Sequence, residues 1–143
     1  MIAPSDQIPG KRTVFLRVLR QDSPESLPRW ERFEVEVEPG MNLISCLQRV
    51  AANPITVDGE SSTPIVFDCG CLEEVCGSCA MVINGQVRPS CTALIDEYAP
   101  RDGDEIVLEP MGKFPVVRDL MVDRERLFHN LKRVKAWVPI DGT

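Results

Sequence analysis

The sequence predicts an α+β fold, in which a mixed β-sheet packs on one helix and a helical extension follows. Three observations carry this prediction. Two segments near the N-terminus alternate polar and apolar residues, as half-buried strands do. A helical pattern follows them, and an Asn-Gly pair further along marks a second hairpin. Two hairpins around one central helix are the elements of a β-grasp domain.

The first hairpin is expected in residues 12–38, after a loose segment at residues 1–11 that contains two prolines. In residues 12–20 the alternation sets Val14, Leu16 and Val18 against Thr13, Arg17 and Arg20. Residues 30–38 alternate in the same way, and their apolar face consists of Phe33, Val35 and Val37. A polar turn between two such runs indicates a β-hairpin.

The remaining elements follow in chain order. Asn42 is a suitable N-cap for a helix over residues 43–52, whose apolar side carries Leu43, Cys46, Leu47 and Val50. Residues 80–83 and 86–91 flank the Asn84-Gly85 turn as the second hairpin, residues 92–104 form a loop, and residues 105–109 form the last strand. A second helix is expected over residues 122–136, with Asp123 as its candidate cap.

The cysteines are concentrated in one loop. Cys71, Cys76 and Cys79 have the spacing C-x4-C-x2-C, and Cys91 follows twelve positions later. This is the plant-type spacing of thiolates that bind a [2Fe–2S] cluster, in which four ligands serve two irons. The predicted hairpin explains the fourth ligand, because it folds back and brings Cys91 beside Cys79.

Other residues of this loop suit the same purpose. Gly70, Gly77 and Ser78 are small and allow backbone amides to approach the sulfurs. Apolar surroundings are expected from Leu72, Val75, Ala80 and Met81. Cys69 is interpreted as a non-ligand, since its distance in sequence from Cys76 is too wide for the pattern. Cys46, on the apolar helix face, is expected to be a small buried hydrophobe.

Three alternative roles for the cysteines fit the sequence less well. A structural zinc site usually needs two paired knuckles, and only one C-x2-C is present. Disulfides are disfavoured because the thiols are clustered and no signal peptide precedes them. A bacterial [4Fe–4S] ferredoxin would show C-x2-C-x2-C-x3-C-P, which does not occur.

Composition excludes some classes of function. The net charge of −6 over 143 residues argues against binding nucleic acid, which requires a basic face, and against direct binding to anionic lipid. The sequence contains no apolar run near eighteen residues, so no membrane insertion is expected. The single histidine, His129, is expected at the surface, and no residue is assigned as a catalytic acid, base or nucleophile.

Beyond the spacing itself, several stretches resemble a known family. They are Cys71–Gly85, Arg88–Ile95, Lys113–Leu120, Val122–Arg124 and Lys135–Gly142. Together they are similar to the N-terminal half of the iron–sulfur subunit of succinate dehydrogenase or fumarate reductase, over roughly residues 12–143. The variants of these motifs are most similar to the bacterial enzymes that have a diheme cytochrome anchor.

This resemblance implies a function and a domain plan. Cys71, Cys76, Cys79 and Cys91 would ligate a [2Fe–2S] cluster in a β-grasp domain at residues 12–112. Residues 113–143 would be a connector and helix leading to a second domain, absent here, that holds [4Fe–4S] and [3Fe–4S] clusters. The chain would thus be part of an oxidoreductase complex without being catalytic alone.

The resemblance also implies partners. They are a flavoprotein subunit with FAD and, through the full-length protein, a cytochrome b membrane anchor, at the cytoplasmic face of the inner membrane. Leu72 and Val75 are candidates for the flavoprotein docking patch.

Alternative functions are a stand-alone [2Fe–2S] ferredoxin, a [2Fe–2S] subunit of a molybdenum hydroxylase, and a zinc-stabilised interaction module.

Overall fold

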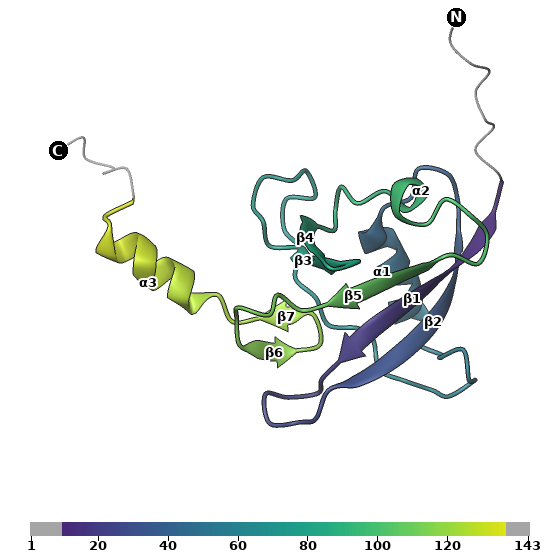
Figure 1. Ribbon diagram of the computed structural model, residues 1–143, viewed down its shortest axis with the longest axis horizontal. Helices are drawn as coiled ribbons and strands as arrows, with labels where there is room; N and C mark the ends of the chain where they lie inside the picture. Colours follow the sequence, from purple (N-terminus) through teal and green to yellow (C-terminus); the bar gives the residue numbers. More distant parts are fainter. Residues whose placement is uncertain (1–9, 137–143) are drawn as a thin grey trace, which may run out of the picture.

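A five-stranded mixed sheet with one long helix on its face forms the body of the protein (Figure 1). The computed structural model describes residues 10–136. The strand order is β2-β1-β5-β3-β4, and β1 and β5 are parallel while the other neighbours are antiparallel. The strands are β1 (Arg12–Arg20), β2 (Arg29–Val37), β3 (Ala80–Ile83), β4 (Gln86–Pro89) and β5 (Glu105–Glu109). The predicted α+β fold of the β-grasp type is confirmed.

The first hairpin has the register that its alternation predicts. Leu16 pairs with Phe33 across β1 and β2, and both side chains are fully buried. One assignment was wrong, because Arg20 lies on the buried face of β1 and not on the polar face. Side chains alternate with a period of two, so Arg20 points the same way as Val14, Leu16 and Val18.

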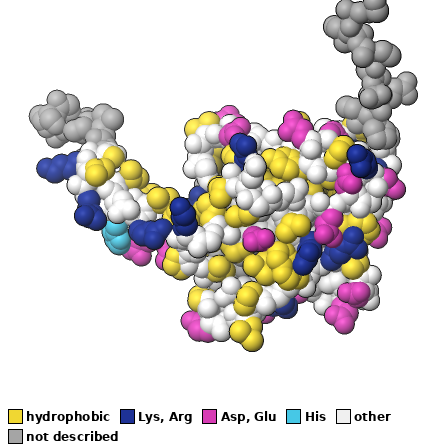
Figure 2. Space-filling view, in the orientation of Figure 1, with side chains coloured by type: hydrophobic (Ala, Val, Ile, Leu, Met, Phe, Trp, Pro, Cys, Tyr) yellow, Lys and Arg dark blue, Asp and Glu magenta, His cyan; other side chains and the backbone are white. Residues whose placement is uncertain are grey.

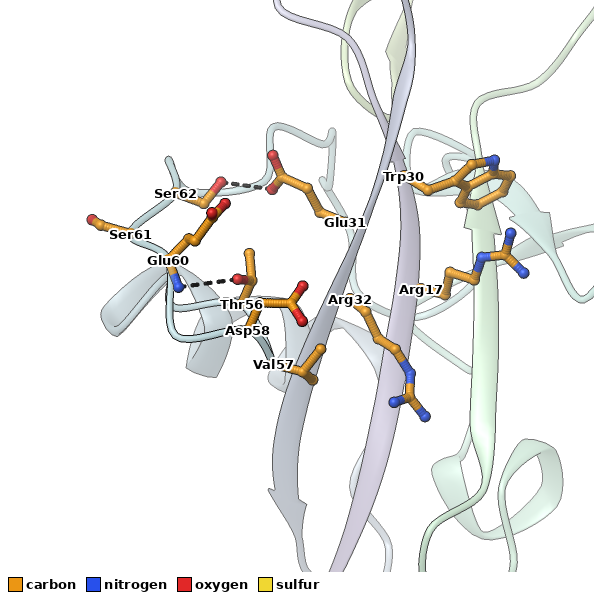
Figure 3. Close-up of a pocket in the computed structure, with 10 residues that line it drawn as sticks. All are labelled: Arg17, Trp30, Glu31, Arg32, Thr56, Val57, Asp58, Glu60, Ser61 and Ser62. Atoms are coloured by element: carbon orange, nitrogen blue, oxygen red, sulfur yellow. Dashed lines mark hydrogen bonds between the residues drawn. The ribbon is translucent and has the colours of Figure 1, made fainter.

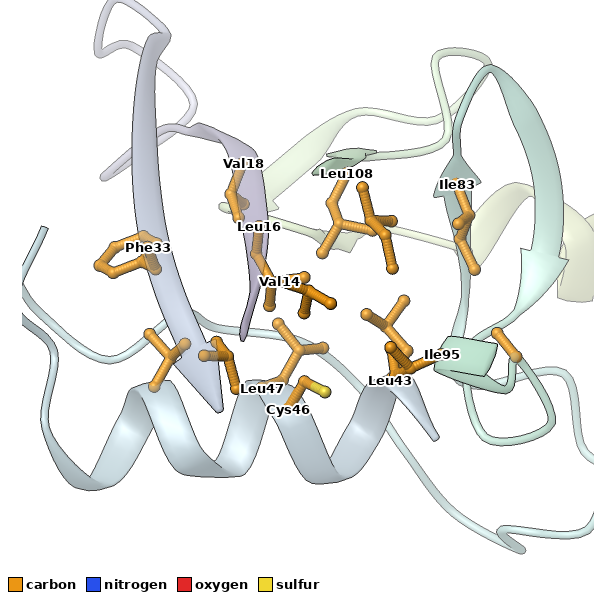
Figure 4. Close-up of a cluster of buried hydrophobic side chains, with 14 of the residues drawn as sticks. Val14, Leu16, Val18, Phe33, Leu43, Cys46, Leu47, Ile83, Ile95 and Leu108 are labelled. Atoms are coloured by element: carbon orange, nitrogen blue, oxygen red, sulfur yellow. The ribbon is translucent and has the colours of Figure 1, made fainter. Parts of the chain in front are cut away.

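Helix α1 (Leu43–Ala52) closes the core. Asn42 caps it as predicted: its Oδ1 accepts a hydrogen bond from the Ser45 amide at 2.9 Å. The predicted apolar side packs onto the sheet, and Cys46 is fully buried there (Figure 4). Burial raises the pKa of the Cys46 thiol to about 12, so this cysteine stays a neutral, small hydrophobe, as expected.

The second hairpin turns at Asn84-Gly85, where both residues have positive φ. Strand β4 ends at Pro89, before the predicted end at Cys91, although the Ser90 amide still donates to the Cys79 carbonyl at 3.2 Å. The predicted loop at residues 92–104 contains one short helix, α2 (Ile95–Tyr98). Its fully buried Ile95 docks it onto the core.

The C-terminal part differs from its prediction. Residues before α3 form a small two-stranded sheet of β6 (Val116–Arg118) and β7 (Met121–Val122). Helix α3 (Glu125–Arg133) is therefore shorter than the predicted 122–136. Asp123 still contributes at its start, since Oδ1 accepts a hydrogen bond from the Glu125 amide at 2.8 Å. Within residues 10–136, no helix has both the length and the hydrophobicity that crossing a membrane requires.

Helix α3 extends away from the body and exposes its apolar residues (Figure 2). Its side chains are 44% exposed at Leu127, 62% at Phe128 and 47% at Leu131. His129 is also exposed, as expected, and lies 3.7 Å from the carboxylate of Glu125, one helical turn earlier. Residues 137–142, which belong to the Lys135–Gly142 stretch that carries the family resemblance, lie outside the described residues.

A buried ion pair ties this C-terminal part to β1. Asp119 and Arg20 are both fully buried, and two bonds join them, Nε to Oδ1 at 2.9 Å and Nη2 to Oδ2 at 3.0 Å. Asp119 also accepts hydrogen bonds from the amides of Gln21 and Val66, while Glu31 is a second carboxylate partner of Arg20. The neighbouring Leu120 belongs to the main core. The segment just before α3 is thus packed into the body.

Candidate metal centre

The cysteine loop, residues 69–79, folds its backbone around two sulfurs. Leu72, Glu74 and Gly77 all have positive φ, near 60° to 70°, which curls the loop tightly. Non-glycine residues adopt this conformation at a cost of about 1–3 kcal/mol each, so it persists only where other contacts stabilise it. Here the curl directs several amides toward the sulfurs of Cys71 and Cys76.

Five backbone amides donate to these two sulfurs. Cys71 Sγ accepts from the amides of Glu73, Val75 and Cys76 at 3.3 to 3.4 Å. Cys76 Sγ accepts at 3.4 Å from the amides of Cys71 and Ser78. Amide donors stabilise a thiolate more than a thiol, and thiolates are the form that binds metal.

The pKa of Cys76 follows from this environment. The Cys71 amide, the Ser78 hydroxyl, the Ser78 amide and the Cys71 thiol lower it, in that order, to about 6. Burial acts in the opposite direction and is the weakest of these effects, because the loop is open to solvent. Cys76 is therefore predominantly a thiolate at neutral pH.

Cys79 and Cys91 form a second, buried pair, with side chains 4% and 5% exposed. The hairpin brings them together as predicted, and Ser90 holds the junction: its amide and hydroxyl both donate to the Cys79 carbonyl, at 3.2 and 2.9 Å. The Asn42 side chain donates to the Cys91 carbonyl at 3.0 Å. The residue that caps α1 thus also fixes the fourth cysteine.

The pKa values of this pair move apart. Burial raises the pKa of Cys79, but hydrogen bonds from the Cys91 amide and thiol and from Ser90 outweigh it and lower the value. The pKa of Cys91 is raised by burial and by the neighbouring Cys79 sulfur, despite a hydrogen bond from the Glu74 amide. Glu74 lies in the loop that surrounds Cys71 and Cys76, so this hydrogen bond connects the two pairs of cysteines.

The four thiols thus form two pairs, Cys71 with Cys76 and Cys79 with Cys91. Among residues 10–136, no three Cys, His, Asp or Glu side chains converge as ligands of one metal ion. A [2Fe–2S] cluster needs two thiolates on each of two irons, and the paired arrangement fits that requirement. The close approach of Gly70 fits it as well, since a Cβ there would lie 3.1 Å from Cys76 Sγ.

One expectation about the loop needs correction, and another stays open to test. Met81 is buried in the main core, while Leu72 and Val75 are 54% and 78% exposed, so these residues do not form an apolar collar around the sulfurs. Cys69 is exposed and takes no part in the amide–sulfur bonds of the loop. Its interpretation as a non-ligand stays a prediction.

A groove of about 450 Å³ lies between β2 and the loop at residues 56–62 (Figure 3). No cysteine lines it. Its wall includes Glu31, which already accepts hydrogen bonds from Arg20 and Ser62, and Arg17, whose guanidinium lies 4.5 Å from the ring centre of Trp30. The groove contains none of the thiols that can bind metal, so the cysteine loop is the candidate site.

A β-grasp body that presents paired thiols in a C-x4-C-x2-C loop defines a plant-type [2Fe–2S] protein. Comparison with known proteins agrees, since residues 15–129 match the family described as "2Fe-2S iron-sulfur cluster binding domain". The chain belongs to this family, and its cofactor is a [2Fe–2S] cluster.

Relatives of the chain are known by name. It is 53% identical over 133 residues to the succinate dehydrogenase iron–sulfur subunit of Bacillus subtilis, covering 93% of this chain and 51% of the relative. It is 31% identical over 130 residues to the fumarate reductase iron–sulfur subunit of Wolinella succinogenes, covering 89% and 50%. The chain therefore spans about half the length of these relatives.

A solved structure has the same fold. A chain of the Mycobacterium smegmatis Sdh1 complex in the apo form superposes with a TM-score of 0.76 at 24% sequence identity. The match covers 94% of this chain and 52% of that one.

Sequence reasoning missed several residues around the thiols. Asn42 was predicted only as a helix cap, and Ser90 was not singled out. Arg124, which donates to two carbonyls of the cysteine loop, carried no local signal, because its partners lie more than forty positions earlier.

Proposed function

We propose that this chain is the [2Fe–2S] electron-transfer domain of the iron–sulfur subunit of a succinate dehydrogenase or fumarate reductase. The observation that carries the proposal is the arrangement of four thiols in two pairs. Backbone amides donate to the sulfurs of the more exposed pair, Cys71 and Cys76. In this proposal Cys71 and Cys76 hold one iron, and Cys79 and Cys91 hold the other. The similarity to named subunits of both enzymes supports the choice of complex.

Different residues of the chain have different roles around the cluster. When bound, the cluster accepts and passes on one electron at a time. The amides of the loop stabilise negative charge on the sulfurs of Cys71 and Cys76, which favours the reduced state. The buried Cys79 and Cys91 keep water away from the inner side. No side chain is needed as acid, base or nucleophile.

The exposed tip of the loop is the proposed docking patch for a flavoprotein subunit that carries FAD. Leu72 and Val75 expose apolar surface beside Cys71 and Cys76, whose sulfurs accept hydrogen bonds from the loop amides. An electron-transfer partner that covers these side chains would approach the cluster at its least shielded point.

The C-terminal segment has a role of its own in the proposal. Residues 12–112 form the cluster domain, and residues 113–143 connect it to a further domain with [4Fe–4S] and [3Fe–4S] clusters. The exposed apolar side of α3 would pack on that domain. Through it the whole subunit would reach a cytochrome b anchor at the cytoplasmic face of the inner membrane.

The first test is the metal content of anaerobically purified chain. We expect about two irons and two acid-labile sulfides per chain, and a reduced S = 1/2 electron paramagnetic resonance signal with mean g below 2. Zinc in place of iron, with no such signal after cluster reconstitution, would refute the electron-transfer proposal.

The second test concerns the docking patch. Leu72→Asp places a charge in the patch, and we expect weaker binding to the flavoprotein subunit with unchanged iron content. Leu27→Asp is the matched control, since Leu27 is 87% exposed but lies in the turn between β1 and β2. Binding of the Leu72→Asp variant at wild-type strength would remove the patch from the proposal.

A further inference from the structure

Arg124 joins the start of α3 to the C-terminal end of the cysteine loop. Its Nη1 donates to the Gly77 carbonyl at 2.6 Å, and its Nη2 donates to the Ser78 carbonyl at 2.7 Å. Gly77 and Ser78 are the only two residues between Cys76 and Cys79, so they connect the two thiol pairs. The planar guanidinium therefore holds the short segment on which the relative position of the pairs depends.

The same contact sets the direction of one amide that faces a sulfur. In a trans peptide the carbonyl and the N–H point in opposite directions. The Gly77 carbonyl points to Arg124, and the Ser78 amide of that peptide points to Cys76 Sγ at 3.4 Å. Gly77 has a φ of +70°, which glycine adopts without strain. The Ala80 amide donates to the same carbonyl at 3.1 Å, and together with it Arg124 orients the N–H···S bond on the other side of the peptide.

The charge of Arg124 is directed at the loop as well. Among residues 10–136, no carboxylate oxygen lies within 4.0 Å of its guanidinium, in contrast to Arg12, Arg20 and Arg29, each of which has an acidic partner. Its Nε is buried and has no hydrogen-bond partner within that part of the chain. Reduction adds one negative charge to the cluster, so a half-buried, unneutralised cation beside the loop favours the reduced state.

We propose that Arg124 is a positioning residue that raises the reduction potential of the cluster, and that it makes this potential depend on how residues 121–133 are seated. The inference rests on the proposed ligation by Cys71, Cys76, Cys79 and Cys91. A movement of α3 that withdraws the guanidinium would release the Gly77–Ser78 peptide and remove a positive charge together. Both changes lower the reduction potential, so the potential of the cluster depends on the position of residues 121–133.

The test is a redox titration of the cluster-loaded chain, followed by electron paramagnetic resonance. In Arg124→Met we expect the ratio of reduced to oxidised cluster at a fixed potential to fall about tenfold, which is 59 mV for a one-electron couple. Arg124→Lys keeps the charge without the two-pronged contact and should give an intermediate shift. Arg126→Met is the matched control: it removes the same charge two residues away, from a side chain that donates to the Lys113 carbonyl and not to the loop.

Each outcome decides the proposal. An Arg124→Met chain with full iron and the wild-type potential overturns it, and so do equal shifts in Arg124→Met and Arg126→Met, which would reduce the effect to distant charge. If Arg124→Met loses its cluster, Arg124→Lys decides, because a wild-type potential in that variant overturns the positioning role.

A second readout separates this inference from the proposed function. Hydrogen exchange of the amides at residues 70–80 should be about tenfold faster in Arg124→Met than in Arg126→Met, whichever metal the thiols hold. Equal exchange in the two variants overturns the positioning role even if the iron is as proposed. Zinc in the wild-type chain would refute the proposed function and leave this comparison valid.

Discussion

Removing the Asp119 carboxylate should strongly destabilise the fold. In Asp119→Ala, the fully buried Arg20 loses its bidentate partner, and the amides of Gln21 and Val66 lose an acceptor. Breaking a buried ion pair by deleting one partner costs about 3–5 kcal/mol. Glu31 keeps one contact to Arg20, which holds the expected loss within this range and not above it.

Urea unfolding followed by circular dichroism measures this loss. With a typical urea dependence of about 1–3 kcal/mol per M, the midpoint should fall by roughly 2 M while the slope stays unchanged. Asp119→Asn separates charge from backbone conformation, since asparagine also tolerates the positive φ at this position, and it should give a smaller shift. Asp22→Ala breaks an exposed pair with Arg29 and should leave the midpoint unchanged.

The reasoning about Asp119 would be refuted by a small effect. A midpoint of Asp119→Ala within about 0.5 M of the wild type would mean that the buried pair contributes little beyond its own desolvation cost. A large effect in Asp22→Ala would also contradict it, because exposed pairs would then count as much as buried ones.

Three further predictions concern the thiols and their surroundings. In metal-free chain, the alkylation rate of Cys76 should rise with pH, with a midpoint near pH 6, because the loop amides favour its thiolate. The thiolate is lost as the pH falls through that value. A midpoint near the ordinary thiol pKa of about 8.5 would contradict the prediction. Cys46→Ser buries a hydroxyl and should destabilise the fold by about 1–3 kcal/mol in urea without changing the iron content, and a loss of iron would instead make Cys46 part of the site. Gly70→Ala places a Cβ 3.1 Å from Cys76 Sγ and should lower iron occupancy. Gly112→Ala is the control, because its Cβ meets no atom within 4 Å. Equal iron occupancy in both variants would show that the loop can shift to accommodate the added methyl group.

The predictable part of the fold rests on local patterns. The alternation in β1 and β2, the Asn42 cap and the Asn84-Gly85 turn each determine their own surroundings, so they located two strands, one helix and a second hairpin within a few residues. The spacing of Cys71, Cys76 and Cys79 likewise describes one continuous loop.

The unpredicted part depends on partners that are distant in sequence. Arg20 looks like a surface residue until Asp119, 99 positions later, is placed against it. Arg124 finds its carbonyls 46 and 47 positions earlier. Helix α2 is too short to show periodicity, and β7 precedes α3 where the pattern favoured one longer helix.

The strand order has a consequence for the timing of assembly. The β3–β4 hairpin, which leads from Cys79 back to Cys91, joins the sheet only through β5, and β5 in turn pairs with β1, about ninety positions earlier. Because β5 follows Cys91 in the sequence, this pairing cannot form until all four cysteines of the motif have been synthesised. A growing polypeptide has therefore exposed all four cysteines of the motif before the strand that positions them exists. Iron and sulfide are expected to be inserted after translation has passed β5, and in the interval the thiols depend on a reducing environment to escape oxidation.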